Sequence, residues 1–129
     1  MPKASKQSAS EHESLEGYEG HFEHFDGGYS VGFETYTADA DLAPLFKGLP
    51  DDRCQCPHWG YVIKGQMRVS YGDREEVLCA GDLYYLPPGH TGVVEQDFEC
   101  IEFSPPAAHE QVVDVIQRNA AVAQTAAAV

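Results

Sequence analysis

Hydrophobic and polar positions alternate with a period of two over most of the middle of the chain. In the segment from Tyr29 to Thr37, the side chains of Tyr29, Val31, Phe33 and Thr35 share one face, which is typical of a half-buried β-strand. Turn residues separate further short segments that we expect to be strands, over residues 56–64, 66–71, 75–79, 83–86, 91–95 and 98–103. Strands at this spacing, with no long helices between them, predict an all-β antiparallel sandwich or barrel.

The two ends of the chain follow other patterns. Residues 1–20 are polar, and we expect a flexible acidic tail or a poorly ordered first strand, with the barrel occupying residues 21–104. Asp39 to Leu49 predicts a short helical or looped crossover. Ser104 is the expected N-cap of an amphipathic helix over residues 105–119, because an apolar stripe follows it. The Ala-rich end, residues 120–129, has no stripe or cap and is expected to fray.

Composition and charge exclude several classes of partner. The chain has 129 residues, with 8 Lys and Arg against 21 Asp and Glu, for a net charge of −13. Such a chain repels nucleic acids and anionic membrane surfaces. It has no apolar run of roughly 18 residues, the length a membrane-spanning helix needs, and no apolar stretch follows its first ten residues as in a secretory signal. Four cysteines are too few for a disulfide-built fold, so we expect reduced thiols and a cytoplasmic protein.

Soft metal donors are concentrated between residues 54 and 58. On an extended strand Cys54, Cys56 and His58 would project to one side, with regular pairing beginning near His58 because Pro57 has no N–H group. Thiolate and imidazole donors suit zinc, copper or nickel better than calcium or magnesium. His90 follows a Pro-Pro-Gly turn and is the expected further donor. The hypothesis is therefore a metal site made of Cys54, Cys56, His58 and His90.

Other interpretations of these residues stay open. Cys54 and Cys56 could be small buried core residues or a redox pair. His58 could be a polar lumen residue bonded to a neighbour, and His90 a turn residue facing solvent. The remaining candidates are Cys79 and Cys100, which we expect in the core, and His21, His24 and His109, which we expect at the surface. Glu34 is expected to face solvent, with a lumen carboxylate as the alternative.

The glycine and proline frame resembles that of a small single-domain cupin. The family's second motif (Gly, five residues, Pro, one residue, Gly, two residues, His) matches at Gly81, Pro87 and Gly89, with Gly92 in the place of the histidine. The first motif ends with a Glu seven positions before a Gly, and here His58 precedes Gly65 by that distance. The resemblance covers roughly residues 20–104.

The resemblance implies a double-stranded β-helix, or jelly-roll barrel, with one metal ion in its lumen and a homodimeric assembly. This chain departs from the family at the ligands, because the family's paired histidines fall at Asp52 and Cys54 and its Glu falls at His58. His90 has the strand parity of Gly92 and could replace the ligand missing there. The departures favour a softer ion than the family's usual iron or manganese, with zinc first and copper, nickel or iron as alternatives.

Three classes of function follow from these residues. The leading hypothesis is a metal-dependent enzyme, such as an oxygenase, lyase or isomerase, that acts on a small organic molecule. The alternatives are a non-catalytic carrier or sensor of a metal or small ligand, and a purely structural dimeric barrel. An enzyme requires an open coordination position and a pocket, whereas a carrier would have four protein ligands and no cavity.

Overall fold

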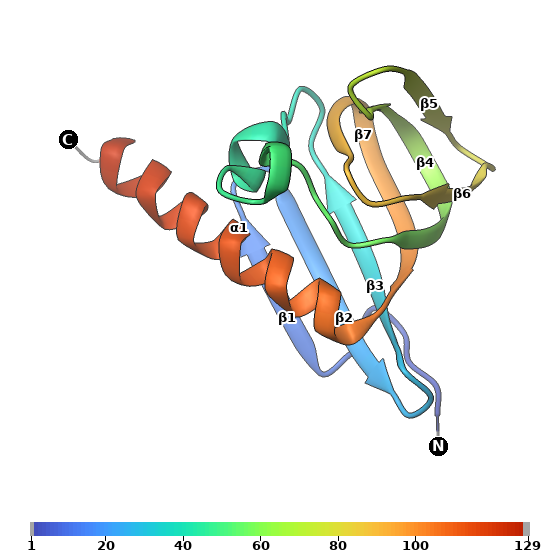
Figure 1. Ribbon diagram of the computed structural model, residues 1–129. Helices are drawn as coiled ribbons and strands as arrows, with labels where there is room; N and C mark the ends of the chain where they lie inside the picture. The colour runs from blue at the N-terminus through green and yellow to red at the C-terminus, as the bar shows by residue number, and fades with distance from the viewer. Residues whose placement is uncertain (1, 128–129) are drawn as a thin grey trace.

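The computed structural model describes residues 2–127, which form one antiparallel sheet followed by one helix (Figure 1). Its strands are β1 (Glu11–Leu15), β2 (Tyr18–Phe25), β3 (Tyr29–Tyr36), β4 (His58–Ser70), β5 (Glu75–Cys79), β6 (Leu83–Leu86) and β7 (Thr91–Ser104). Their order in the sheet is β1-β2-β3-β7-β4-β5, and β6 pairs with β4. The sheet curls as a jelly roll, which confirms the predicted fold class, but it does not close into a complete barrel.

A helix and two short turns cover the interior where the sheet is open. The helix is α1 (Pro106–Ala127), and the 3₁₀ turns are η1 (Ala43–Phe46) and η2 (Pro50–Asp52). In Figure 1 the helix crosses β1 and β2, with η1 beside it. Val112 of the helix packs against Phe46, and the Asn119 side chain donates a hydrogen bond to the Leu45 carbonyl at 2.7 Å. These contacts attach the helix to the crossover predicted between Asp39 and Leu49.

Two strands are longer than the sequence pattern suggested. Residues 56–64 and 66–71 were expected as separate strands, yet β4 runs through both, and β7 likewise joins residues 91–95 and 98–103. The turn-like residues at Lys64–Gly65 and Gln96–Asp97 lie at register shifts between β4 and β7. Gly65 has a φ of +89°, and a Cβ atom there would overlap the Asp97 carbonyl. Both strands therefore bend at this point without ending.

The ends of the chain also differ from expectation. Residues 11–20 follow the strand alternative and not the tail, because β1 and the first residues of β2 form a paired hairpin there. The helix starts at Pro106 and continues to Ala127, past the predicted end at 119, while residues 128–129 lie outside the described part. Ser104, the expected N-cap, is the last residue of β7, and its hydroxyl contacts His58 instead.

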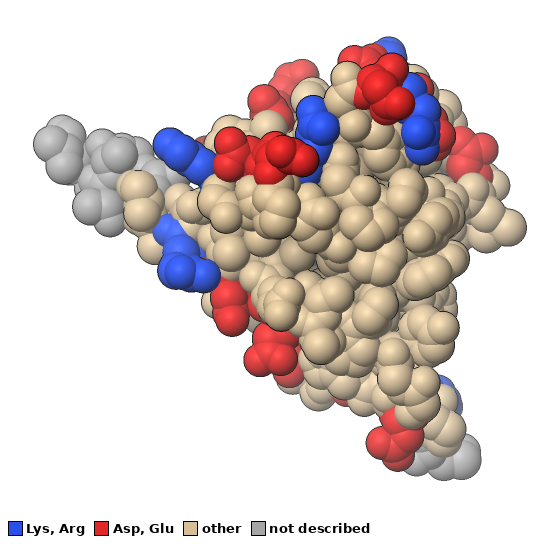
Figure 2. Space-filling view, viewed as in Figure 1, with Lys and Arg blue, Asp and Glu red and all other residues tan. Residues whose placement is uncertain are grey.

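The surface charge is unevenly distributed. On the face shown in Figure 2, acidic and basic side chains gather over the β4–β5 end and along the helix, and the middle of this face is uncharged. Among residues 2–127, no helix has the length and hydropathy needed to cross a membrane.

The bend at Gly65 gives a test of the fold. Gly65→Ala should lower the free energy of unfolding by about 3 kcal/mol, because left-handed strain of roughly 1–2 kcal/mol adds to the overlap with Asp97. Gly28 is the matched control, since it has the same φ of +89° but nothing within 4 Å of an added Cβ. Urea denaturation of both variants separates the cost of the left-handed backbone from the cost of the overlap with Asp97. Equal losses in both would show that β7 does not approach Gly65 as described.

Candidate metal centre

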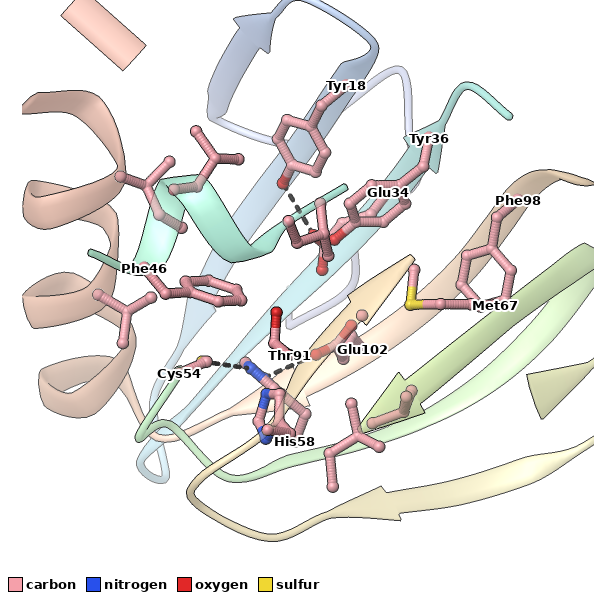
Figure 3. Close-up of a pocket in the computed structure, with 18 of the residues that line it drawn as sticks. Tyr18, Glu34, Tyr36, Phe46, Cys54, His58, Met67, Thr91, Phe98 and Glu102 are labelled. Carbon is pink, nitrogen blue, oxygen red and sulfur yellow. Dashed lines mark hydrogen bonds and ion pairs between the residues drawn. The ribbon is translucent and has the colours of Figure 1, made fainter. Parts of the chain in front are cut away.

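His58 is held inside the barrel by two residues of β7. It is the first residue of β4, which confirms that regular pairing begins after Pro57. Its Nδ1 atom lies 2.7 Å from Glu102 Oε1 and 2.7 Å from the Ser104 hydroxyl oxygen. The carboxylate requires a hydrogen on Nδ1, so Nε2 is the ring atom directed at Cys54, whose sulfur is 3.6 Å away (Figure 3). The ring orientation is thereby fixed by hydrogen bonding.

Cys54 and His90 are brought together by a backbone bridge outside the named strands. The Cys54 N–H donates to the His90 carbonyl at 2.9 Å, and the Gly89 N–H donates to the Cys54 carbonyl at 2.8 Å. His90 Nδ1 donates to the Pro87 carbonyl at 2.7 Å, which leaves Nε2 without a hydrogen in the neutral ring. The centroids of the His58 and His90 rings are 5.2 Å apart.

The structure brings together three of the four residues predicted as ligands. The ligand atoms of Cys54, His58 and His90 all lie within 4.8 Å of one another. Cys56 lies outside this group: it precedes β4, so strand alternation does not apply to it, and its thiol donates weakly to the Pro57 carbonyl at 3.5 Å. Cys56 is fully buried in a cluster with Phe46. The interpretation of Cys56 as a core residue is thus the one that the geometry favours.

The donor set fits a soft divalent metal ion. One thiol sulfur and two imidazole nitrogens match the ligands that zinc takes in proteins. Both imidazoles also have their second ring nitrogen fixed, His58 by Glu102 and His90 by the Pro87 carbonyl. Such outer hydrogen bonds are the usual support of metal-binding histidines. Three protein donors leave a fourth tetrahedral position for a further ligand.

The charges of the centre reinforce one another. Burial acts to lower the pKa of His58, but the Glu102 carboxylate overcomes this and raises it well above 6.5. Burial acts to raise the pKa of Glu102, whereas the charge and hydrogen bond of His58 lower it to about 2. For Cys54, burial again opposes ionisation, and hydrogen bonds with His58 and His90 lower the thiol pKa to about 6. As a result, Glu102 is ionised near neutral pH and Cys54 readily forms a thiolate.

A second carboxyl group lies beside Glu102. Glu34 is buried, against our expectation that it faces solvent, and its Oε2 accepts hydrogen bonds of 2.8 Å from both Tyr18 and Tyr36 (Figure 3). Burial, and next the negative charge of Glu102, raise the pKa of Glu34 to about 8. One carboxyl is therefore ionised and its neighbour largely protonated near pH 7. Such pairs are characteristic of acid–base sites.

Glycine makes room for the aromatic partner of Glu102. Tyr84 donates a hydrogen bond of 3.0 Å to Glu102 Oε2. Gly60 on β4 lies between them in register, paired with Glu102 on one side and Tyr84 on the other. A Cβ at position 60 would overlap the Tyr84 ring. The absence of a side chain at Gly60 thus lets Tyr84 reach across β4 to the carboxylate.

The donors border a cavity of about 100 Å³ with mostly apolar walls. Its lining includes Leu45 and Phe46 from the crossover and Val112 and Ile116 from the helix. Thr91 also lines it, and its buried hydroxyl has no hydrogen-bond partner within the described residues. The cavity therefore combines an aliphatic wall with a polar end where one hydroxyl is free to bind a guest.

Some residues lie elsewhere than expected. Cys100 is buried as expected, but Cys79 is exposed. His109, expected at the surface, lines the cavity and packs against Phe22, with ring centroids 4.9 Å apart. Burial, followed by the charge of His58, lowers the pKa of His109 to about 4, so its ring is neutral. Its spacing from Val112 and Ile116 places it on their helix face, a signal that the sequence carried.

Glu102 was missed by the sequence analysis, although its position was informative. Phe98, Cys100, Glu102 and Ser104 alternate along β7 and all are buried. A charged residue that continues an apolar period-two face is costly to bury without a partner. This signal could have identified Glu102 as a lumen group, but not His58 as its partner.

Comparisons with known proteins agree with this architecture. The family model described as "AraC-like ligand binding domain" matches residues 57–123, slightly more than half of the chain. An RmlC-like cupin from Shewanella frigidimarina has a TM-score of 0.59 and 18% identity, over 82% of this chain and 91% of that one. Ectoine synthase from P. lautus has a TM-score of 0.62 and 11% identity, over 82% and 78%. KdgF from Halomonas sp. has a TM-score of 0.53 and 19% identity, over 74% of this chain and 87% of that one.

No curated protein sequence matches the chain significantly. The structural matches have low sequence identity, so they establish the fold and do not extend to activity or ligand.

The buried pair of His58 and Glu102 can be tested in the metal-free protein, with a chelator present to exclude metal ions. Glu102→Gln should lower the pKa of His58 below 6.5, because burial then acts without the carboxylate, and should cost about 3 kcal/mol of stability near pH 6. NMR titration of the His58 ring measures the pKa, and urea denaturation measures the loss of stability. In the wild type the contribution of the pair is lost as pH falls through about 2 or rises through the raised pKa of His58. Glu99→Gln, on the same strand, is the control; an unchanged His58 titration in Glu102→Gln contradicts the pairing.

Proposed function

Because the chain belongs to the family of AraC-like ligand-binding domains, which are small cupins, we propose that it is a metal-dependent enzyme acting on a small organic molecule in the barrel lumen. The observation that carries this proposal is the convergence of Cys54, His58 and His90 at the edge of a cavity that also holds an ionised and a protonated carboxyl group.

Cys54, His58 and His90 would hold the ion, and we propose zinc because its preferred donors are thiolate and imidazole. When bound, such an ion supplies Lewis-acid activation of an oxygen or sulfur atom of the small molecule. Glu102 holds a hydrogen on His58 Nδ1, so Nε2 is the atom that can act as a ligand once the imidazolium has released its other proton. The low pKa of Cys54 makes its thiolate available near neutral pH.

Glu34 would carry the proton. Its pKa of about 8 keeps it largely protonated at neutral pH, so it can donate a hydrogen bond or a proton at its carboxyl oxygen. Tyr18 and Tyr36 bind the other oxygen and fix the orientation of the carboxyl group. A positioned proton donor favours a lyase or isomerase over an oxygenase among the three reaction classes considered.

The cavity favours a small and largely apolar substrate. The aliphatic side chains of η1 and α1 offer a surface for hydrocarbon, and the Thr91 hydroxyl offers one hydrogen bond at the polar end. The substrate would therefore carry one polar group toward the metal centre and an apolar part under the helix.

A non-catalytic ligand-binding domain is the second candidate, and the description of the matching family favours it. In that case the same cavity and metal centre bind a small molecule without converting it. A metal carrier is less well supported, since the centre has three protein donors and borders a cavity.

We also propose that the protein works in the cytoplasm as a homodimer. All four cysteines are free thiols, which suits a reducing compartment.

Cobalt titration tests the ligand set. The chelator-treated protein should bind one Co²⁺ per chain and gain a near-ultraviolet sulfur-to-cobalt absorption. Cys54→Ser should abolish that absorption and weaken binding on the order of 100-fold, and His58→Ala and His90→Ala should weaken it similarly. Cys56→Ser should keep both the sulfur-to-cobalt absorption and the affinity for Co²⁺. Cys79→Ser, at an exposed position, serves as a general thiol control. Loss of the absorption in Cys56→Ser, or its retention in Cys54→Ser, rejects this ligand set.

Azide tests whether a coordination position is open. Added to the Co²⁺-loaded protein, azide should change the visible absorption of the cobalt saturably, because a fourth position is accessible from the cavity. Val112→Phe, which places a larger side chain in the cavity wall, should weaken azide binding at least tenfold. A spectrum that does not respond to azide indicates a closed four-ligand centre and supports the carrier function.

A further inference from the structure

A second group of metal-binding side chains lies on the outer surface of the first hairpin, away from the lumen. His12 of β1 and His21 of β2 are directly paired, so their side chains project to the same side. Glu19 precedes His21 by two residues and shares that side. Phe22, the next residue, is buried and packs against His109 of the helix. These three residues, which we call the hairpin site, therefore lie on the face opposite the helix (Figure 1).

The two imidazole rings of the hairpin site are arranged to share one ion. They are stacked, with centroids 4.3 Å apart and an angle of 8° between their planes. The ligand atoms of both rings and of the Glu19 carboxylate all lie within 4.8 Å of one another. His12 and Glu19 are exposed and His21 is half-buried. Small rotations of these side chains bring the three atoms to the bond length of about 2.0–2.2 Å that zinc takes with such ligands.

The donors of the hairpin site are not used by other parts of the structure. Within the described part of the chain, neither ring makes a hydrogen bond or an ion pair. The Thr35 hydroxyl donates to the backbone carbonyl of Glu19, which leaves the carboxylate unpaired. His24, on the same strand, differs because both of its ring nitrogens contact side chains, those of Ser30 and Glu11. The hairpin site therefore offers three free donors on one face.

The chemistry and charge of the surroundings favour a transition-metal cation. Residues 7–46 contain no Lys or Arg and the chain carries a net charge of −13, so the potential around the hairpin attracts cations. Two imidazoles and one carboxylate suit zinc, nickel, copper or iron, whereas calcium and magnesium take oxygen ligands. The hairpin site has neither a thiolate nor hydrogen bonds that orient its rings. We therefore expect it to bind more weakly than the lumen centre and to fill after it.

We propose that His12, Glu19 and His21 bind a second divalent transition-metal ion on the outer surface of the β1–β2 hairpin. This inference goes beyond the proposed function and does not depend on an ion in the lumen. β1 has five residues and lies at the edge of the sheet, where its neighbour is β2. Glu13 follows His12 on β1 and lines the lumen cavity. An ion that bridges the two strands therefore stabilises this part of the cavity wall.

Nickel is the probe, because it binds imidazole nitrogen and its unpaired electrons broaden the NMR signals of nearby nuclei. Ni²⁺ added to the isotope-labelled whole chain should saturably broaden the signals of His12, Glu19 and His21, and hydrogen exchange of the β1 amides should slow. His12→Ala and His21→Ala should each weaken this binding on the order of 100-fold, since losing a ligand costs at least as much as losing its outer hydrogen bond. Circular dichroism at wild-type levels checks that the variants fold.

His24→Ala is the matched control, since His24 is exposed on the same strand and belongs to the opposite face. It should leave Ni²⁺ binding at the hairpin unchanged, as should Cys54→Ser, which removes a donor of the lumen centre. Unbroadened hairpin signals, or broadening that persists in both His12→Ala and His21→Ala, overturn the proposal. Equal loss in His24→Ala overturns it as well, because the ligands would then lie elsewhere. The signals of His58 report on the lumen separately, so failure of the hairpin site is distinguishable from failure of the proposed function.

Discussion

The ion pair of His58 and Glu102 inside the barrel is the interaction on which the candidate site depends. A carboxylate in this apolar interior would be costly alone, and the 2.7 Å contact with His58 Nδ1 compensates for its burial. The pair acts on its neighbours. It turns His58 Nε2 toward Cys54, whose thiol pKa is lowered by hydrogen bonds with His58 and His90 and then by their charges. The charge of Glu102 adds to burial, the larger cause, in raising the pKa of Glu34. The proposed metal donors and the proposed proton donor are thus electrostatically linked through this pair.

Strand alternation places this pair and the exposed rings of Trp59 and Phe103 on opposite sides of the same strands. β4 and β7 direct His58 and Glu102 inward, while Trp59 and Phe103 project outward. The lumen is therefore mostly apolar with one polar cluster in it, and part of the outside of the same strands is apolar as well.

Much of the fold could be predicted from turn residues and alternation, but the direction of one strand face could not. We expected Glu34 to face solvent, because it lies opposite the apolar face that Tyr29, Val31 and Phe33 form on this strand. In the structure Glu34 and Tyr36 line the lumen. At the site, Cys54, His58 and His90 do converge, since the Pro-Pro-Gly turn and the start of β4 were recognisable. The Cys56 thiol is not in that group, because Cys56 precedes β4 and strand alternation does not extend to it. The pairing of Glu102 with His58 depends on strand register, which local sequence does not specify.

We propose that Cys54, His58 and His90 bind one metal ion at the position where their donor atoms converge. Anomalous diffraction at the zinc absorption edge, from crystals grown with zinc, tests it most directly. We expect a single strong peak bonded to Cys54 Sγ and to Nε2 of both histidines, with Glu102 still paired to His58 Nδ1. Absence of a peak between these three residues, or a peak bonded to Cys56 instead of Cys54, would contradict it.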